Sequence, residues 1–449
     1  MNSINIKKLV AKNSLYSLLG PMSNIAAWLF LFKFIILNFG YEQFGLWSLT
    51  IGVASVVRLF DLSGASNLSA YIRVAGVKEK QAVLNSSILI SLFCNSFCLI
   101  ILFNLIHLAL KKVVPVDLHD LLLVFLVFSA LINIISGMNN ALNAYLDGEY
   151  KSNVRSWIQV ISLILFILII LLSSSLGIVS VAIAAFAQQL FVFFTISIYV
   201  KSNFFFSGVM FYKKNINTLH SIFKLGLKTF SSQASILATE IIPKYFISNY
   251  LGLSIIPLYE LASKIFININ ILFVSFCNPL LPRLREVFVS DEGNHIKLLR
   301  QYYYQFTFLN LLCYVFLITM TDIISTIFLG AKNSEFSTIF TLLALCYFIE
   351  INAYYFALVN VASNYFRINV FSQFLKIALL LGFTALFSKF NASLLVYVVG
   401  FSGLISAVTL VNLSQIKFRY LKNSTHFLNI FFVGIIICLL FLFEIKNNL

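Results

Sequence analysis

The same stretch occurs twice in this chain, first as Phe39-Gly40-Tyr41-Glu42-Gln43-Phe44-Gly45-Leu46-Trp47-Ser48-Leu49 and again as Leu251-Gly252-Leu253-Ser254-Ile255-Ile256-Pro257-Leu258-Tyr259-Glu260-Leu261. One constant offset pairs Gly40 with Gly252 and Trp47 with Tyr259. Each copy lies between two long apolar runs. A repeat of this kind indicates that the chain consists of two related halves.

The composition places both halves in a membrane. Of the 449 residues, 60% are hydrophobic and only 10% are charged, whereas soluble domains carry roughly 25% charged residues. Apolar stretches of about 20 residues, each long enough to cross a bilayer core, recur along the whole length. Because the bilayer offers no water to backbone groups, we expect an all-α polytopic membrane protein.

We expect about 12 transmembrane helices. Their approximate residue ranges are 14–38, 44–68, 83–109, 119–141, 152–173, 177–200, 221–250, 254–281, 302–329, 335–361, 366–388 and 393–416. A thirteenth apolar run, Phe427 to Phe443, has about 17 residues and stands at the lower limit for a span. It is either an extra span or a helix lying on the membrane surface.

The longest polar connection divides the chain after six expected spans. The predicted domains are an N-terminal six-helix bundle (1–200), a cytoplasmic linker (201–220), a C-terminal six-helix bundle (221–416), and a basic connection with an apolar helix (417–449). An even number of spans in each half makes the repeats parallel, related by an axis along the membrane normal. Such repeats are common in alternating-access transporters, and the absence of a long loop argues against most membrane enzymes.

The basic residues indicate the orientation of the spans. With a cytoplasmic N-terminus, 21 Lys and Arg residues lie near the cytoplasmic ends of the spans and five lie near the opposite ends, namely Lys111, Lys112, Lys332, Lys389 and Lys446. This bias predicts a cytoplasmic N-terminus. The net charge of +15 therefore follows from membrane topology, and we expect no nucleic-acid partner.

Three short segments resemble those of one transporter family. Residues Phe60-Asp61-Leu62-Ser63-Gly64-Ala65-Ser66-Asn67-Leu68-Ser69-Ala70-Tyr71-Ile72-Arg73 resemble the end of the second helix of Wzx-type polysaccharide flippases. Asn249-Tyr250-Leu251-Gly252, with Pro257-Leu258-Tyr259-Glu260-Leu261-Ala262-Ser263-Lys264-Ile265, is similar to their seventh and eighth helices, and Pro279-Leu280-Leu281-Pro282-Arg283-Leu284 to the exit from the eighth. The resemblance extends over the whole chain in length and number of spans.

The resemblance implies a fold, a function and a location. It implies membership of the superfamily that also holds multidrug and toxic-compound (MATE) extruders and lipid II flippases, with two six-helix bundles around a central cavity. It implies that the protein moves an undecaprenyl-diphosphate-linked oligosaccharide from the cytoplasmic to the periplasmic leaflet of a bacterial inner membrane, for O-antigen (lipopolysaccharide) or capsule biosynthesis. Partners in such a pathway are a polymerase and chain-length components; no cofactor and no chemistry on the substrate are implied.

Charged residues inside the expected spans are the candidate site residues, because each charge at mid-bilayer costs about 2.5–3.5 kcal/mol on insertion scales. Glu240 precedes Lys244 by four residues, and Glu260 precedes Lys264 by four, the favourable spacing for contact within a helix. Arg58 and Asp61 are three apart and can pair likewise. For these pairs, neutralisation between packed helices and a role in the cavity both remain open.

Lys33 and Lys376 have no acidic neighbour within one helical turn, so we expect them to meet an anionic ligand. A diphosphate group needs cations, and Lys or Arg supply charge-assisted hydrogen bonds. The candidates for binding substrate are Lys33, Arg58, Lys244, Lys264 and Lys376. The candidates for ion coupling or charge pairing are Asp61, Glu240, Glu260, Asp322 and Glu350.

Other polar groups and other functions fit less well. The stripe Asn133, Ser136, Asn139, Asn140 and Asn143 suits sugar hydroxyls and interhelical hydrogen bonds equally. No cysteine pattern predicts a metal site. A multidrug or organic-ion extruder of the same superfamily is the first alternative, although lone lysines favour an anionic substrate. A polysaccharide polymerase or ligase is the second, and it is disfavoured because the outer connections are short.

Overall fold

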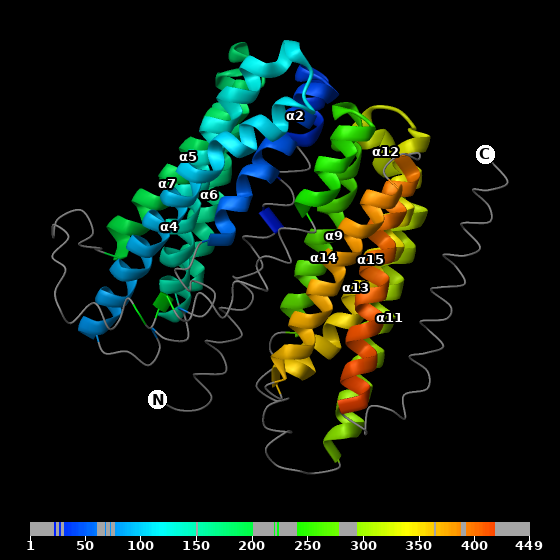
Figure 1. The fold of residues 1–449 in the computed structure, drawn as a ribbon. Coiled ribbons are helices and arrows are strands. Elements are labelled where there is room, and N and C mark those ends of the chain that lie inside the picture. Colours follow the sequence, from blue (N-terminus) through cyan, green and yellow to red (C-terminus); the bar gives the residue numbers. More distant parts are fainter. Residues whose placement is uncertain are drawn as a thin grey trace. The chain divides into compact units, whose positions relative to one another are not determined.

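The computed structural model describes residues 22–23, 27, 31–60, 68, 72, 77–149, 151–200, 220, 222–223, 240–277, 294–362, 365–387 and 392–417. Every regular element within these ranges is a helix, which confirms the all-α prediction (Figure 1). The elements are α2 (Tyr41–Ala54), η1 (Ser55–Phe60), α4 (Val77–Lys111), η2 (Val116–Leu118), α5 (His119–Gly148), α6 (Ser152–Leu172), η3 (Ser174–Leu176), α7 (Val179–Val200), η4 (Leu253–Ile255), α9 (Ile256–Cys277), α11 (Asn294–Thr319), α12 (Thr321–Leu329), α13 (Ser334–Ala362), α14 (Phe366–Phe387) and α15 (Ala392–Lys417). Residues 31–39 and 240–250 are also helical.

The long helices have the dimensions of membrane spans. In the described part of the chain, six helices are long and apolar enough to cross a bilayer, or up to seven if the bent pair α11 and α12 forms one span. The two helices of this pair are bent by 57° relative to each other, within the region 302–329 where the sequence predicts one span. The chain is therefore a multi-pass membrane protein.

The chain forms two compact units, Met1–Pro257 and Leu258–Leu449. The sequence predicts the division within 201–220, of which only residue 220 is described, so the predicted domain boundary stays a prediction. The thirteenth apolar run, Phe427 to Phe443, lies outside the described residues.

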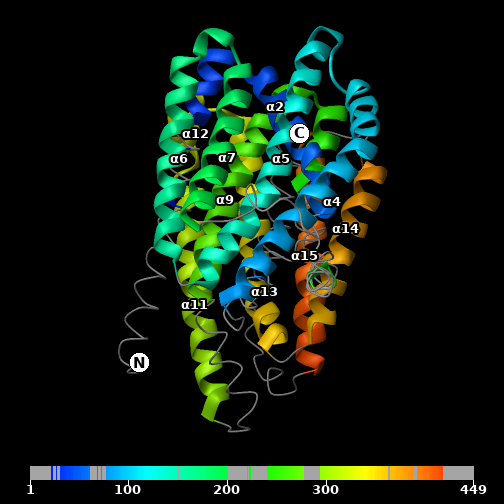
Figure 2. The same ribbon diagram turned by 90° about the vertical axis from the view of Figure 1, so that its left-hand side faces the viewer.

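In the first unit, α5 is the central helix and contacts α2, α4, α6 and α7 (Figures 1 and 2). The Trp47 ring of α2 meets the Phe125 ring of α5 edge to face, with centroids 5.2 Å apart. Trp47 is buried. Its large apolar surface fastens the first copy of the repeat to the centre of this unit.

In the second unit, α15 packs against α13 and α14, while α11 packs against α13. The Phe266 ring of α9 packs against rings of α11 and α13. Its centroid lies 5.5 Å from that of Tyr314 in α11 and 4.6 Å from that of Phe340 in α13. All three rings are buried and form an aromatic core for this unit.

The backbone repeats the pattern found in the sequence. Gly40 precedes α2 with φ 83° and ψ 170°, and Gly252 precedes η4 with φ 91° and ψ 168°. This region of backbone angles is open almost only to glycine. Trp47 and Tyr259, which share a register position, are both buried. The two copies therefore share one turn geometry and one buried face.

We expect Gly40→Ala and Gly252→Ala each to lower the free energy of unfolding by about 1–3 kcal/mol, because a Cβ makes these backbone angles strained. Thermal unfolding of the purified protein in detergent measures the change. The matched control is Gly382→Ala in α14, where an added Cβ meets no atom within 4 Å. Alanine favours a helix interior, so this variant should be no less stable than the wild type. Equal midpoints for all three variants would contradict the strained geometry.

Candidate functional site

Lys244 is the most deeply buried of the candidate cations in the described chain. It lies on the helix 240–250 with only 2% of its side chain exposed, and its Nζ lies 3.5 Å from Oε1 of Glu240 one turn earlier. Across from it, α2 presents Gly52, whose ideal Cβ position is 3.5 Å from Cδ and 3.7 Å from Nζ of Lys244. The lysine therefore lies over the glycine surface of α2, within the first unit.

The second same-helix pair, Glu260 and Lys264 on α9, has the opposite burial. The carboxylate is 4% exposed, the ammonium-bearing side chain is 29% exposed, and the Nζ to Oε1 distance is 3.7 Å. Both same-helix pairs are longer than an ordinary charge-assisted hydrogen bond of about 2.7–2.9 Å. Each lysine thus has a carboxylate of its own helix beside it.

Lys376 has no acidic neighbour within one turn of its own helix, but it pairs with a carboxylate of another helix. Its Nζ on α14 lies 2.6 Å from Oε1 of Glu350 on α13. A third helix, α15, approaches the carboxylate at Gly403, where an ideal Cβ would lie 2.2 Å from Oε1 of Glu350. The partner is distant in sequence, and the contact exists because three helices of the second unit pack together.

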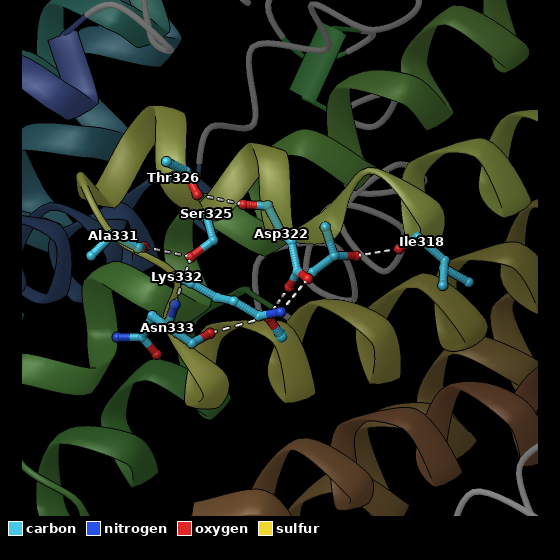
Figure 3. A network of polar contacts seen from close by, with 9 residues as sticks. Ile318, Asp322, Ser325, Thr326, Ala331, Lys332 and Asn333 are labelled. Atoms are coloured by element: carbon cyan, nitrogen blue, oxygen red, sulfur yellow. Dashed lines mark hydrogen bonds and ion pairs between the residues drawn. The ribbon is translucent and has the colours of Figure 1, made fainter.

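Asp322 lies at an exposed turn, not in the apolar interior that its predicted span 302–329 implied. Figure 3 shows its carboxylate beside Lys332, and the Oδ2 to Nζ distance is 2.5 Å. The two side chains are 54% and 69% exposed. The chain changes direction at Met320, and Asp322 lies in the first turn of α12, where it faces Lys332 of the turn before α13.

The same turn is held by hydrogen bonds around Ser325. Its Oγ donates to the carbonyl oxygen of Ala331 and accepts from the backbone N–H of Asn333, as Figure 3 shows. The Oδ1 of Asn333 in turn accepts from the N–H of Phe336 in the first turn of α13. These hydrogen bonds hold the turn that places Lys332 beside Asp322.

The remaining candidates lie in the first unit or outside the described residues. Lys33 is exposed on the helical stretch 31–39. Arg58 belongs to η1, which continues α2 as a 3₁₀ helix, and its side chain lies outside the description. Asp61 is also outside the described residues, so the predicted Arg58–Asp61 pair stays a prediction.

One residue of the polar stripe on α5, Asn139, makes interhelical hydrogen bonds. The Nδ2 of Asn139 donates to both the backbone oxygen and Oε1 of Gln189 on α7, at 3.0 and 2.9 Å. Asn133 instead donates to the Ser129 carbonyl oxygen within its own helix. These bonds fit the interpretation of the stripe as contacts between helices.

Sequence reasoning missed two glycines that shape the charged positions, Gly52 and Gly403. Each is a helical glycine that faces a charged side chain of another helix. The sequence shows that each glycine lies in an apolar span. It does not show which side chain faces the glycine, because that depends on how the helices pack. In the described residues, no group of three or more His, Cys, Asp or Glu side chains could hold a metal ion.

Comparisons with known proteins place the fold among transporters. No family model and no curated protein matches the sequence, but solved structures match nearly the whole chain. An inward-facing MATE-family multidrug transporter of the MOP superfamily has a TM-score of 0.69 at 13% identity, covering 92% of this chain and 99% of that one. The lipid II flippase MurJ, in an inward closed conformation, has a TM-score of 0.68 at 17% identity, covering 96% and 92%.

A third similar structure shows how widely this fold varies. A MOP-superfamily transporter from Pyrococcus furiosus, described by the reverse polarity of its binding pocket, has a TM-score of 0.58 at 13% identity, covering 93% of this chain and 96% of that one. The chain therefore has the MOP-superfamily transporter fold. Drug transporters and a lipid flippase share that fold, so the fold alone does not identify a substrate.

We expect the two interhelical or turn-bridging pairs to differ in strength. In double-mutant cycles with alanine, Glu350 and Lys376 should show a coupling energy of about 2 kcal/mol, because their pair is largely shielded from water. Asp322 and Lys332 should show about 0.2–1 kcal/mol, because their pair is exposed. Thermal unfolding of the four variants of each cycle, in the same detergent, gives both values. A coupling energy at the exposed pair that equals or exceeds the buried one would contradict the structure.

Proposed function

We propose that the protein is a flippase that moves an undecaprenyl-diphosphate-linked oligosaccharide repeat unit from the cytoplasmic to the periplasmic leaflet for surface polysaccharide biosynthesis. The observation that carries the proposal is Lys244, a buried lysine on an apolar helix whose carboxylate partner lies 3.5 Å away. The fold supplies the transporter class. The resemblance of residues 249–265 to polysaccharide flippases supplies the substrate class.

The chemistry of the same-helix pairs suits a diphosphate. A lysine held by a carboxylate at 3.5 or 3.7 Å can turn to a phosphate oxygen, and the carboxylate that it leaves must then take up a proton or be hydrated. Between substrates, the carboxylate keeps the ammonium neutralised in the apolar surroundings. We therefore assign substrate binding first to Lys244 and Lys264, with Lys33 and Arg58 as further candidates. Lys376 is not among them, because Glu350 holds it at 2.6 Å.

For alternating access, the lysines must bind the substrate with different affinities in two conformational states of the protein. Binding energy moves a transporter only when the two states bind the substrate with different affinity. Pro243, beside Lys244, removes one helix hydrogen bond and permits a bend at the charged position. The proposed location is a bacterial inner membrane with a cytoplasmic N-terminus, in agreement with the bias of basic residues.

We expect Lys244→Gln to cause lipid-diphosphate-linked oligosaccharide to accumulate on the cytoplasmic face of cells that depend on this protein. An enzyme or lectin that reaches only the periplasmic face measures the sidedness. The matched control is Lys332→Gln, which removes an exposed paired lysine and should leave sidedness as in the wild type. The double variant Glu240→Gln/Lys244→Gln removes both charges and separates lost binding from an unpaired buried carboxylate.

Unchanged sidedness on depletion of the protein would overturn the flippase. Export of organic ions that is lost on depletion would then favour the multidrug extruder, the alternative that shares this fold. Normal transport by Lys244→Gln in a well-inserted protein would keep the flippase but remove Lys244 from the binding site.

Gly52 offers a test that changes no charge. Gly52→Ala adds a Cβ at ordinary contact distance from the Lys244 side chain and should transport as the wild type does. Gly52→Leu should displace the Lys244 side chain and lower transport several-fold, because a leucine side chain has no room there. The same sidedness measurement applies, with membrane insertion checked for both variants. Equal transport by the two would show that the position of Lys244 on α2 does not matter.

A further inference from the structure

Glu350 and Lys376 form the shortest of the three ion pairs among the candidate charges buried in the described helices. The pair joins α13 to α14 at 2.6 Å, with 26% of the glutamate and 11% of the lysine side chain exposed. In contrast to the pairs at Lys244 and Lys264, its members belong to different helices. The proposed substrate site does not use this pair, which leaves its role to be explained.

The carboxylate of Glu350 lies in a position that needs a cation. A carboxylate among apolar helices must be protonated or must have a positive charge beside it. Here the Lys376 ammonium supplies that charge and makes the pair neutral. The ammonium therefore occupies the place that a free monovalent cation would take beside a single carboxylate.

Gly403 of α15 makes room for the Glu350 carboxylate. An added Cβ at Gly403 would lie 2.2 Å from Oε1, the oxygen that contacts Lys376. The close approach of α15 is therefore compatible with the carboxylate only because residue 403 has no side chain. Three helices of one unit build the position together.

The Tyr314 hydroxyl does not compete with Lys376 for the carboxylate. The Tyr314 hydroxyl of α11 donates its hydrogen bond to Oδ1 of Asn270 on α9, at 2.7 Å. Among the described residues, Lys376 is the cation paired with Glu350. One negative charge thus meets one positive charge, and both belong to the protein.

We propose that Lys376 is a tethered counter-cation that fills a monovalent-cation site at Glu350, so that the second unit needs no Na⁺ there. Removing the ammonium unmasks a site that a small monovalent cation can occupy. This inference does not depend on the proposed substrate. It follows that a sodium gradient does not drive transport through this carboxylate.

The test is the thermal unfolding of the full-length protein, purified in detergent, in NaCl and in N-methylglucamine chloride at equal ionic strength. The wild type should unfold at the same temperature in both salts. Lys376→Met should unfold at a temperature higher by roughly 2 °C in NaCl, because an ion that binds only the folded state stabilises it. The double variant Glu350→Gln/Lys376→Met should lose this difference, because it has no carboxylate to bind the ion.

Two controls separate site binding from a general effect of salt. Lys376→Arg keeps the positive charge and should respond to the salts as the wild type does. Lys332→Met removes the lysine of the exposed Asp322 pair, where water solvates the carboxylate, and should show no preference for Na⁺.

Two results would overturn the proposal. One is a Na⁺-dependent shift in the wild type that Glu350→Gln abolishes, since the ion would then bind despite the lysine. The other is a Lys376→Met variant that is destabilised equally in both salts. If this variant does not fold in N-methylglucamine chloride, recovery of folded protein in NaCl supports the tethered cation, and failure in both salts overturns it.

Discussion

A charged side chain inside a bilayer has no water to stabilise it, and the arrangement of this protein's interior follows from that constraint. Each described lysine that is buried or partly buried at a candidate position lies beside a carboxylate, at Glu240, Glu260 or Glu350. Glycines stand against two of these groups, Gly52 against Lys244 and Gly403 against Glu350. Charge pairing therefore explains where helices approach closely as well as where charges lie.

The pairs differ in how firmly they hold their lysine, and this difference separates their roles. In the two same-helix pairs, at 3.5 and 3.7 Å, a carboxylate balances the charge of the ammonium. The proposed function has the ammonium move from this carboxylate to a phosphate. The Glu350–Lys376 pair, at 2.6 Å between two helices, joins α13 to α14, and we propose that it also fills a cation site. The proposed transport of a charged substrate calls for both kinds, because substrate binding requires an exchange of partners whereas a rigid bundle requires pairs that stay together.

The two halves share a backbone pattern but not their charges. Gly40 and Gly252 adopt the same rare backbone angles, and the same offset relates Ser48 to Glu260, Gly52 to Lys264 and Phe32 to Lys244. In the first half these three positions are uncharged; in the second they carry charged members of the two same-helix pairs. The two copies thus share the turn and the buried face, while these three charged residues occur in the second half alone.

The sequence alone determined the features that depend on neighbours along the chain. Apolar length predicted the spans, and four-residue spacing predicted the pairs of Lys244 and Lys264, because a helix brings such residues together wherever it lies. Only the tertiary structure paired Lys376 with Glu350, since that contact requires α13, α14 and α15 to pack at Gly403. The break at Met320, which has no proline or glycine beside it, likewise moved Asp322 to an exposed turn with Lys332. Partners on different helices are chosen by packing, and the local pattern of residues does not encode packing.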